Sequence, residues 1–394
     1  MKTMTKLGLL PRIIIAIIIG IAIGYVSPLW LTRLAVTFKG LMGQFLSFLV
    51  PLIIIGFVTP AIADIGRKRA GSLLLITIAL AYGFTLIAGF TSYFVGDWLF
   101  PSMIDRSIAS QIVGEASAAT ATAYVNFSID PLMSVFTALV TALMMGLGIT
   151  FIKGRTLREG FDEFREIVSM VINRAVIPLL PPYILCIFME MTAAGQIGPI
   201  LTTFFTIILV IFALHIGILL LQFAIAALFN RQNPLRMLRT MMPAYFTALG
   251  TQSSAATIPV TLECTTKIGV DKDIAGFTVP LCATIHMSGS TLKIVACALA
   301  LIIMQGGDYS VATFAQFIAM LGITIVAAPG IPGGAIMASL GLLSAVLGFT
   351  DSQNAMMIAL YISMDSFGTA CNVTGDGAIS VIVDRVSKKI GHAA

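Results

Sequence analysis

Charged residues are scarce in this chain. Only 10% of its 394 residues are Asp, Glu, Lys or Arg, against 58% hydrophobic residues. A soluble globular domain has about 25% charged residues, so the composition excludes an ordinary soluble protein and indicates a polytopic membrane protein. The net charge of +5 does not indicate a nucleic-acid partner, because the basic residues stand in short clusters between apolar runs, as they do in cytoplasmic loops.

Cysteine pairs and a processing signal are also lacking. The five cysteines lie in or beside apolar segments and form no C-x-x-C pair. We therefore interpret them as small core residues rather than as disulfides or structural metal ligands. The first apolar run, 13–26, is not followed by a convincing small-residue cleavage site, so we expect no cleavable signal peptide.

Apolar segments long enough to cross a bilayer follow one another along the first 230 residues. At about 20 residues per span, they lie near 12–30, 38–61, 71–95, 131–152, 167–193 and 198–229. Basic clusters precede the first span, follow the second, fourth and sixth, and end the chain. The loop 96–130 has Arg106 as its single basic residue. By the positive-inside rule, both termini are expected in the cytoplasm.

The remainder of the chain breaks this pattern with polar and helix-breaking residues. The apolar run 237–268 is interrupted at 247–259, and hydrophilic residues stand at both its ends. A segment that begins and ends on one side is a re-entrant hairpin, which is tolerated only against protein or a water-filled cavity. A second hairpin is predicted over 313–348, because two prolines and three glycines within 328–334 cannot continue a helix.

Each hairpin is followed by a span that polar residues interrupt. The span 275–304 contains His286-Met-Ser-Gly-Ser290, and the last span, 355–383, contains Asn372-Val-Thr-Gly-Asp376. We interpret these two segments as parallel cores of two halves. Because the hairpins are expected to enter from opposite faces, the arrangement is an inverted repeat, which points to the midplane site of a transporter.

The last span contains a stripe of polar residues. If the span is helical, Asp365, Thr369, Asn372 and Asp376 fall at spacings of four, three and four and share one face. A charged side chain at mid-bilayer costs roughly 3 kcal/mol, so the stripe indicates a place where a small polar solute or a cation is held. The structural alternative is a stripe that only holds helices together.

Four segments resemble, in the same order, motifs of the dicarboxylate/amino-acid:cation symporter family, the glutamate-transporter homologues. They are 252–259 (QSSAATIP), 280–290 (PLCATIHMSGS), 330–337 (GIPGGAIM) and 372–376 (NVTGD). The resemblance implies an all-α polytopic membrane protein with eight transmembrane helices, two re-entrant helical hairpins and inverted repeats. It also implies a homotrimer and an elevator-type transport mechanism.

The resemblance also divides the chain into a fixed scaffold and a mobile transport domain. The scaffold would comprise residues 1–70 (spans 1 and 2), 131–166 (span 4) and 167–193 (span 5). The transport side would comprise 71–130 (span 3 and the extracellular loop), 194–232 (span 6) and the core 233–394 (hairpin 1, span 7, hairpin 2 and span 8).

Carried over onto this chain, the resemblance implies a substrate site and a cation site. The substrate site would comprise Gln252, Ser253, Ser254, Pro332, Gly333, Asp365, Thr369 and Asn372. Asp365 would receive a substrate ammonium, and the serines would hold a carboxylate with the backbone N–H groups of the hairpin tip. The cation site for a sodium ion would comprise Asp376, Asn372 and carbonyl groups near Cys282 and Thr284. No other cofactor is expected.

The chain departs from the family pattern where charge recognition is concerned. Gly368 stands where acidic-substrate members have an arginine, and Gln252 stands where some archaeal members have one. Loss of that guanidinium fork argues against aspartate or glutamate as substrate. His286-Met287-Ser288 replaces the usual Asn-Met-Asp, which removes a sodium-ligating carboxylate and its amide. One sodium site is therefore expected to be absent.

His286, Ser288 and Lys293 are candidates for coupling transport to a cation gradient. His286 is either a satisfied structural histidine or a proton carrier, because imidazole titrates near neutral pH. Lys293 lies two turns after His286. It is either a snorkelling side chain near the outer end of the span or a fixed charge at the substrate site. As a fixed charge it would pair with Asp365, replace a sodium ion or hold an anionic substrate.

We therefore expect a secondary active symporter for a small carboxylate-bearing solute, with an amino acid as first choice, in the inner or plasma membrane. Coupling would be to sodium with reduced stoichiometry or to protons. The alternative is a dicarboxylate or monocarboxylate carrier in which Lys293 binds the anion and His286 carries the proton. A different class is an anion-conducting channel. An enzyme is not expected, because Asp365 and Asp376 lie about 16 Å apart along one helix, too far for a carboxylate pair.

Overall fold

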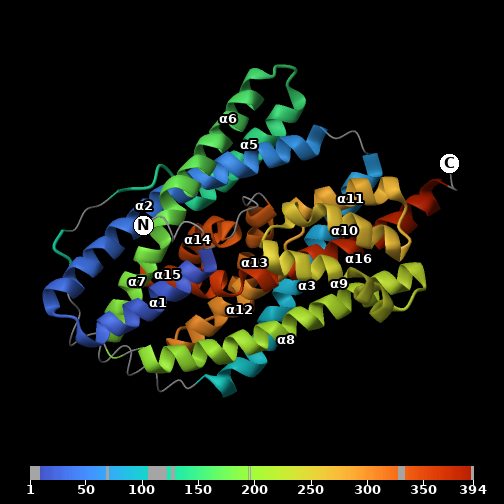
Figure 1. The fold of residues 1–394 in the computed structure, drawn as a ribbon. Coiled ribbons are helices and arrows are strands. Elements are labelled where there is room, and N and C mark those ends of the chain that lie inside the picture. Colours follow the sequence, from blue (N-terminus) through green and yellow to red (C-terminus); the bar gives the residue numbers. More distant parts are fainter. Residues whose placement is uncertain are drawn as a thin grey trace.

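The computed structural model describes residues 9–67, 71–104, 122–125, 129–193, 195, 197–326 and 333–391. Within these ranges the regular secondary structure is helical, with no β-strand. The expected all-α class is confirmed for this part of the chain. Figure 1 shows the helices packed into one elongated body.

The first half of the chain forms mostly apolar helices, of which the helix at 156–171 is the amphipathic exception. They are α1 (Leu9–Val26), α2 (Leu29–Arg67), α3 (Gly71–Met103), α5 (Val135–Phe151), α6 (Thr156–Val171), the π-helical turn η2 (Ile172–Val176), α7 (Ile177–Ala193) and α8 (Ile197–Asn230). Helix α2 is longer than the predicted span, because its apolar character extends towards its start at Leu29.

The second half forms eight helices within the described residues, most of them shorter than 20 residues. They are α9 (Pro234–Thr251), α10 (Ser254–Ile268), α11 (Lys272–Ile285), α12 (Ser288–Met304), α13 (Val311–Val326), α14 (Gly334–Leu347), α15 (Asp351–Ser363) and α16 (Asp365–Gly391).

Several helices are long and apolar enough to cross a membrane. Among the described residues there are five: Leu29–Pro60, Leu73–Met103, Thr156–Ala193, Phe204–Asn230 and Lys272–Met304. Their outer faces carry large apolar side chains that are exposed, such as Leu75, Phe205 and Leu228, as expected for contact with lipid. The number of eight spans stays a prediction.

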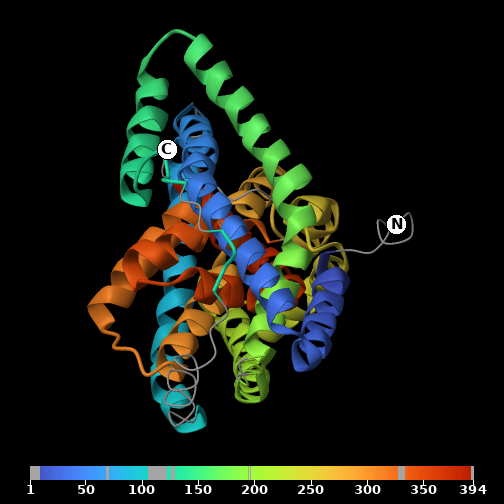
Figure 2. The same cartoon turned by 90° about the vertical axis from the view of Figure 1, so that its left-hand side faces the viewer.

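The helices gather into two groups. Helix α1 packs on α7, and α2 packs on α5 and α7, whereas α16 packs on α8, α9, α10, α11 and α12. In Figure 1 these groups lie at opposite ends of the body, with α13 to α15 between them. Figure 2 shows α5 and α6 projecting beyond the remainder of the molecule. The grouping resembles the expected scaffold and transport parts, whose boundaries stay a prediction.

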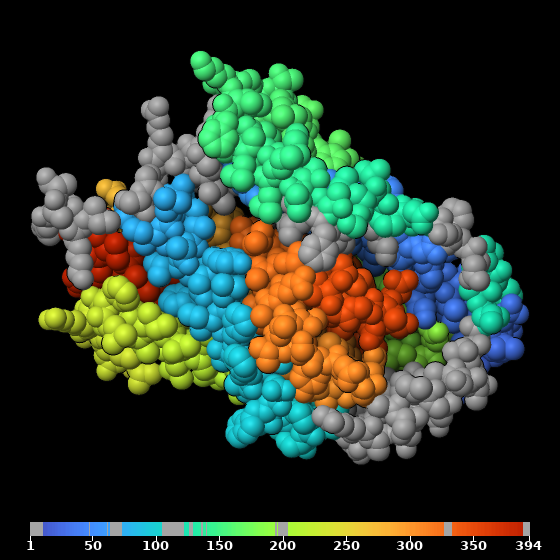
Figure 3. All heavy atoms as spheres, turned by 180° about the vertical axis from the view of Figure 1, so that it is seen from behind, coloured from blue at the N-terminus to red at the C-terminus, as the bar shows by residue number. Residues whose placement is uncertain are grey.

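Helix α12 lies at the centre of the second group. Every residue of α12, from Ser288 to Met304, is buried, with α3 packed along it. Figure 3 shows α3 on the outer surface beside α13. Polar side chains on α12 are therefore far from bulk water and need partners within the protein.

Two helix pairs stand where the sequence predicts hairpins. Helices α9 and α10 pack on each other and are joined by Gln252 and Ser253. Gln252 adopts a left-handed conformation with φ 53°, and the Ser253 hydroxyl caps α10 by accepting the N–H of Ala256. Helices α13 and α14 also pack on each other, but their link, with Pro332, lies outside the described residues. The re-entrant course of both pairs stays a prediction.

One of the two interrupted spans is broken where the sequence predicts, and the other is broken elsewhere. The break between α11 and α12 falls at His286 and Met287, inside the predicted segment. In the last span the break falls at Met364, between α15 and α16, while Asn372–Asp376 continues as helix within α16. The expectation of two parallel broken cores is therefore wrong. Gly375 serves close packing instead, because a Cβ there would collide with Gln222 and His286.

Candidate transport site

The start of α16 carries a buried ion pair. The Lys293 ammonium lies 2.9 Å from Oδ1 of Asp365, and the two side chains are 0% and 5% exposed. The second oxygen, Oδ2, accepts a hydrogen bond of 2.7 Å from the N–H of Gly333 at the start of α14. Asp365 thus joins α12, α14 and α16, and both of its oxygens are engaged.

The Lys293 ammonium is surrounded by further electron-rich groups. The carbonyl oxygens of Tyr361 and Met364 each lie 3.5 Å from Nζ. The centroid of the Tyr361 ring lies 3.4 Å from the same atom, which is cation–π geometry. Both carbonyl oxygens also accept backbone N–H groups at the break between α15 and α16, Tyr361 from Met364 and Met364 from Gly368. Lys293 therefore does not snorkel to the membrane surface and is a fixed charge inside the protein.

Gly368 makes room for this lysine. A Cβ at position 368 would lie 2.8 Å from Nζ of Lys293, closer than side-chain atoms normally approach. An arginine at 368, as in acidic-substrate members of the resembled family, is therefore incompatible with Lys293 in this position. The chain supplies its positive charge from α12 rather than from α16.

A second buried pair lies about three turns further along α16. Nδ1 of His286 is 2.9 Å from Oδ1 of Asp376 and 3.2 Å from the carbonyl oxygen of Asn372. The side chains of His286 and Asp376 are 0% and 1% exposed. When Asp376 is ionised, both groups that face Nδ1 are acceptors, so in that state Nδ1 carries a hydrogen.

The other imidazole nitrogen faces Gln222 of α8. Its Nε2 lies 3.3 Å from Nε2 of the glutamine, which also donates to the Ser288 hydroxyl at 3.1 Å. In this orientation the amide donates to an imidazole that is neutral. Turning the amide by 180° would place Oε1, which has no partner among the described residues, where it accepts from a protonated ring. The site therefore has a consistent hydrogen-bond arrangement for both forms of His286.

The Asn372 side chain holds the helix break rather than facing open space. Its Oδ1 accepts the N–H of Gly289 at 2.7 Å, and its Nδ2 donates to the Ser290 hydroxyl at 3.1 Å. This contact supports the structural alternative for one member of the polar stripe. Thr369 lies one turn after Asp365 on α16 and is buried.

The oxygen atoms expected around a sodium ion already bind His286. The Cys282 carbonyl accepts the backbone N–H of His286 at 2.8 Å, and the Asp376 carboxylate and Asn372 carbonyl face its ring. The Thr284 hydroxyl donates to the Leu281 carbonyl at 2.8 Å. In the described residues no three His, Cys, Asp or Glu side chains gather as metal ligands. While the ring is in place, these oxygens have partners within the protein, and a sodium ion at Asp376 stays a prediction.

The hairpin-tip residues are more accessible than these pairs. Gln252, Ser253 and Ser254 are half-buried at the link between α9 and α10, and α10 packs along α16. A non-glycine residue in the left-handed region, such as Gln252, is strained by about 1–3 kcal/mol, and such residues concentrate at functional sites. Gly333, also predicted for the substrate site, donates its backbone N–H to Asp365.

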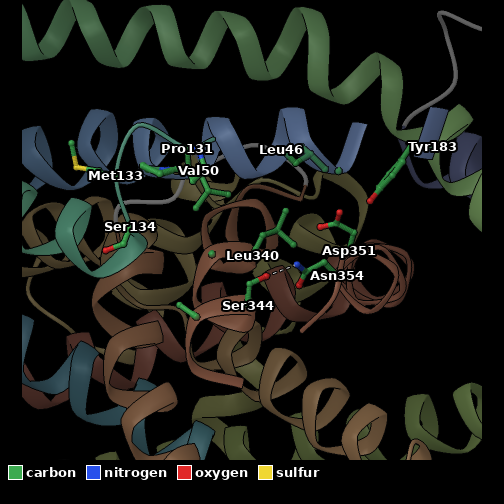
Figure 4. A pocket seen from close by; sticks show the side chains of 14 residues that line it. Leu46, Val50, Pro131, Met133, Ser134, Tyr183, Leu340, Ser344, Asp351 and Asn354 are labelled. Atoms are coloured by element: carbon green, nitrogen blue, oxygen red, sulfur yellow. Dashed lines mark hydrogen bonds between the residues drawn. The ribbon is translucent and has the colours of Figure 1, made fainter. Parts of the chain in front are cut away.

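A cavity of about 290 Å³ lies elsewhere, between α2, α7, α14 and α15. Figure 4 shows Leu46 and Val50 on one side of it and Leu340, Asp351 and Asn354 on the other. None of the residues predicted for the substrate or cation sites lines it. The two ion pairs of α16 are buried, and none of their residues lines this cavity.

Sequence reasoning did not identify Gln222 and Tyr361. Gln222 is a single amide in an apolar part of the sixth span, and Tyr361 precedes the polar stripe by one turn. Nothing in the sequence around either residue indicates that Gln222 contacts His286 or that Tyr361 contacts Lys293. His215 of α8 also contacts α12, because its Nε2 lies 3.0 Å from the Gly289 carbonyl oxygen. Glu190 pairs with Lys39 at 2.6 Å.

Comparisons with known proteins agree with the motifs. The model of the sodium:dicarboxylate symporter family matches residues 9–386. Excitatory amino acid transporter 1 of Rattus norvegicus is 33% identical over 248 residues, which cover 60% of this chain and 44% of the relative. Excitatory amino acid transporter 4 of Mus musculus is 28% identical over 242 residues, 60% of this chain and 42% of the relative. The matched part thus spans less than half the length of these relatives. Because the family model covers nearly the whole chain, the protein belongs to the sodium:dicarboxylate symporter family.

Proposed function

We propose that this protein is a cation-coupled symporter that carries a small carboxylate-bearing solute across the inner or plasma membrane, and that the coupled cation is a proton held between His286 and Asp376. Family membership, the relatives named as transporters and the apolar helices support transport rather than catalysis. In this family sodium enters only as a co-transported ion, and no cofactor is needed.

The position of the His286 ring carries the proposal. Two oxygen atoms, from Asp376 and Asn372, converge on its Nδ1 within 3.2 Å at zero exposure. A buried carboxylate needs a positive partner or a proton. Imidazole supplies both, because it binds a proton near neutral pH and releases it without leaving its place. A sodium ion would have to displace the ring.

The surroundings of His286 allow it to change charge. Asp376 is the charged group in contact with the ring. The Cys282 thiol on α11 is buried near Asp376, Gln222 approaches from α8, and the Phe84 ring of α3 lies 6.4 Å away between centroids. None of these other groups is a cation, so the ring is not opposed by a like charge in contact with it. By turning its amide, Gln222 can hydrogen-bond with Nε2 of His286 in either the neutral or the protonated form of the ring.

The solute carboxylate would be held at the tip of α9 and α10. The first N–H groups of an α-helix have no partner within the helix, and together with the helix dipole they favour an anion. Ser253 and Ser254 stand at the start of α10, which supports the carboxylate-binding role expected for them. Thr369, one turn after Asp365 on α16, belongs to the same proposed substrate site. The elevator movement, the homotrimer and cytoplasmic termini belong to the same proposal.

A thermal-shift screen of the purified full-length protein tests this function. Amino acids, dicarboxylates and monocarboxylates are added in sodium and in choline buffers, each at an acidic and an alkaline pH. A bound solute raises the melting temperature by mass action. We expect a carboxylate to stabilise the protein more at acidic pH, equally in sodium and choline. Stabilisation that requires sodium and is the same at both pH values would overturn proton coupling.

A further inference from the structure

Asp365 has no unoccupied oxygen for a solute. Oδ1 binds the Lys293 ammonium at 2.9 Å and Oδ2 binds the N–H of Gly333 at 2.7 Å. The sequence predicts that this carboxylate receives the ammonium of an amino acid. In the structure, an ammonium is already there, and it belongs to the protein.

We propose that Lys293 is a tethered ammonium that takes the place of a solute amino group at Asp365, so that the transported solutes are carboxylates without a free α-amino group. This inference rests on the proposed function, carboxylate symport, and names its substrate class. The similar proteins are named amino acid transporters, so the inference distinguishes this chain from them.

The surroundings of Nζ are those of a cation site that is filled. A carboxylate, two carbonyl oxygens and the Tyr361 ring face it from the break between α15 and α16. The side chain is 0% exposed and rises from α12, which is buried along its whole length. A tethered group has a high effective concentration at its partner, so an ammonium from solution competes poorly with it.

Charge balance points to the same substrate class. Lys293 and Asp365 together are neutral, so a solute ammonium would bring a second cation to one buried carboxylate. Like charges repel strongly at low dielectric constant. A solute that brings only carboxylate groups avoids this conflict. An amino group on the solute thus weakens its binding to this protein. If Asp365 were unpaired, the same amino group would strengthen binding.

Matched solutes and two variants test the inference. Binding of succinate and L-aspartate, and of propionate and L-alanine, is measured on the full-length protein; the members of each pair differ by the amino group. In the wild type the amino-free member binds better by about tenfold or more, and in Lys293→Ala the order is reversed. Added propylammonium, which matches the atoms removed, restores the wild-type order in Lys293→Ala.

Two controls separate this role from a structural one. Lys267→Ala removes a lysine whose pair with Glu263 is exposed, and it should keep the wild-type order with no response to propylammonium. If Lys293→Ala does not fold, the neutral variant Lys293→Met/Asp365→Asn takes its place and should no longer distinguish the members of a pair.

Three outcomes are decisive. Tighter binding of L-aspartate or L-alanine than of the amino-free partner by the wild type would overturn the inference and leave carboxylate symport standing. The same solute order in Lys293→Ala or in the neutral variant as in the wild type would overturn it as well. Failure of all four solutes, together with every other carboxylate in the screen, would instead contradict the proposed function itself.

Discussion

The two ion pairs on α16 are built alike and differ in the base. Each joins a buried carboxylate of α16, Asp365 or Asp376, to a basic residue at or after the break between α11 and α12. Lysine keeps its charge across the physiological pH range unless its surroundings change, whereas histidine titrates within that range. The groups around Lys293 suit only a cation, while Gln222 can serve either form of His286. The proposals above therefore assign a fixed charge to one pair and a movable one to the other.

Removing the fixed charge should have the largest effect on stability. Lys293→Met leaves Asp365 buried without its cation, and breaking such a pair costs about 3–5 kcal/mol. We expect a large drop in melting temperature, most of which Lys293→Met/Asp365→Asn recovers by removing both charges. His286→Gln should lower it less, because glutamine can still donate to Asp376. A Lys293→Met protein as stable as the wild type would show that Asp365 does not need a charged partner, which would contradict the fixed charge assigned to this pair.

Alanine at two glycines should disturb the pairs separately. A Cβ at Gly375 would lie 2.5 Å from Cε1 of His286, and one at Gly368 would lie 2.8 Å from Nζ of Lys293. Such overpacking costs typically about 1–3 kcal/mol. Gly375→Ala should flatten the pH dependence of uptake, whereas Gly368→Ala should weaken the preference against amino groups.

The control for these glycines is Gly217→Ala on α8, where a Cβ meets nothing within 4 Å. Melting temperature, the pH profile and the solute preference are measured on all three variants. If Gly375→Ala and Gly368→Ala change the same property, the division into a fixed and a movable charge is contradicted.

The smallest effect is expected from Gln222→Leu. The variant keeps the side-chain volume roughly constant but removes the acceptor that a protonated His286 would use at Nε2. The charged ring is then less favoured, so the pH of half-maximal uptake should move to lower values, with a modest change in melting temperature. Uptake is measured as a function of external pH, with Gln222→Glu as the opposite case that favours the charged ring. An unchanged midpoint in both variants would remove Gln222 from the account.

Local patterns in the sequence were sufficient for the family, the helical class and the stripe on α16. Asp365, Thr369, Asn372 and Asp376 are all in one helix, as their spacing predicts. The family follows from four short motifs and is confirmed over residues 9–386. These conclusions depend on periodicity and on short segments, which a single sequence displays directly.

The pair of Lys293 and Asp365 was among the alternatives that the sequence offered, but the other contacts between distant segments were not predictable. The break at Met364 has no proline or glycine to mark it, and its carbonyl faces Lys293, 71 residues earlier in the chain. Whether Asn372 faced a solute or the first turn of α12 at Gly289 depended on how α12 and α16 pack against each other. Gln222 lies 64 residues from His286, in an apolar stretch with no motif around it. Partner choice of this kind is set by tertiary packing.

The most direct measurement of the central claim is solute accumulation in proteoliposomes under an imposed pH gradient without sodium. Wild type and His286→Gln are compared with succinate as the probe, and Lys267→Ala is the control. We predict that an inward proton gradient drives accumulation by the wild type and by Lys267→Ala, and that His286→Gln loses this response. Accumulation by the wild type only with a sodium gradient, or an unchanged response to pH in His286→Gln, would contradict proton coupling at the His286–Asp376 pair.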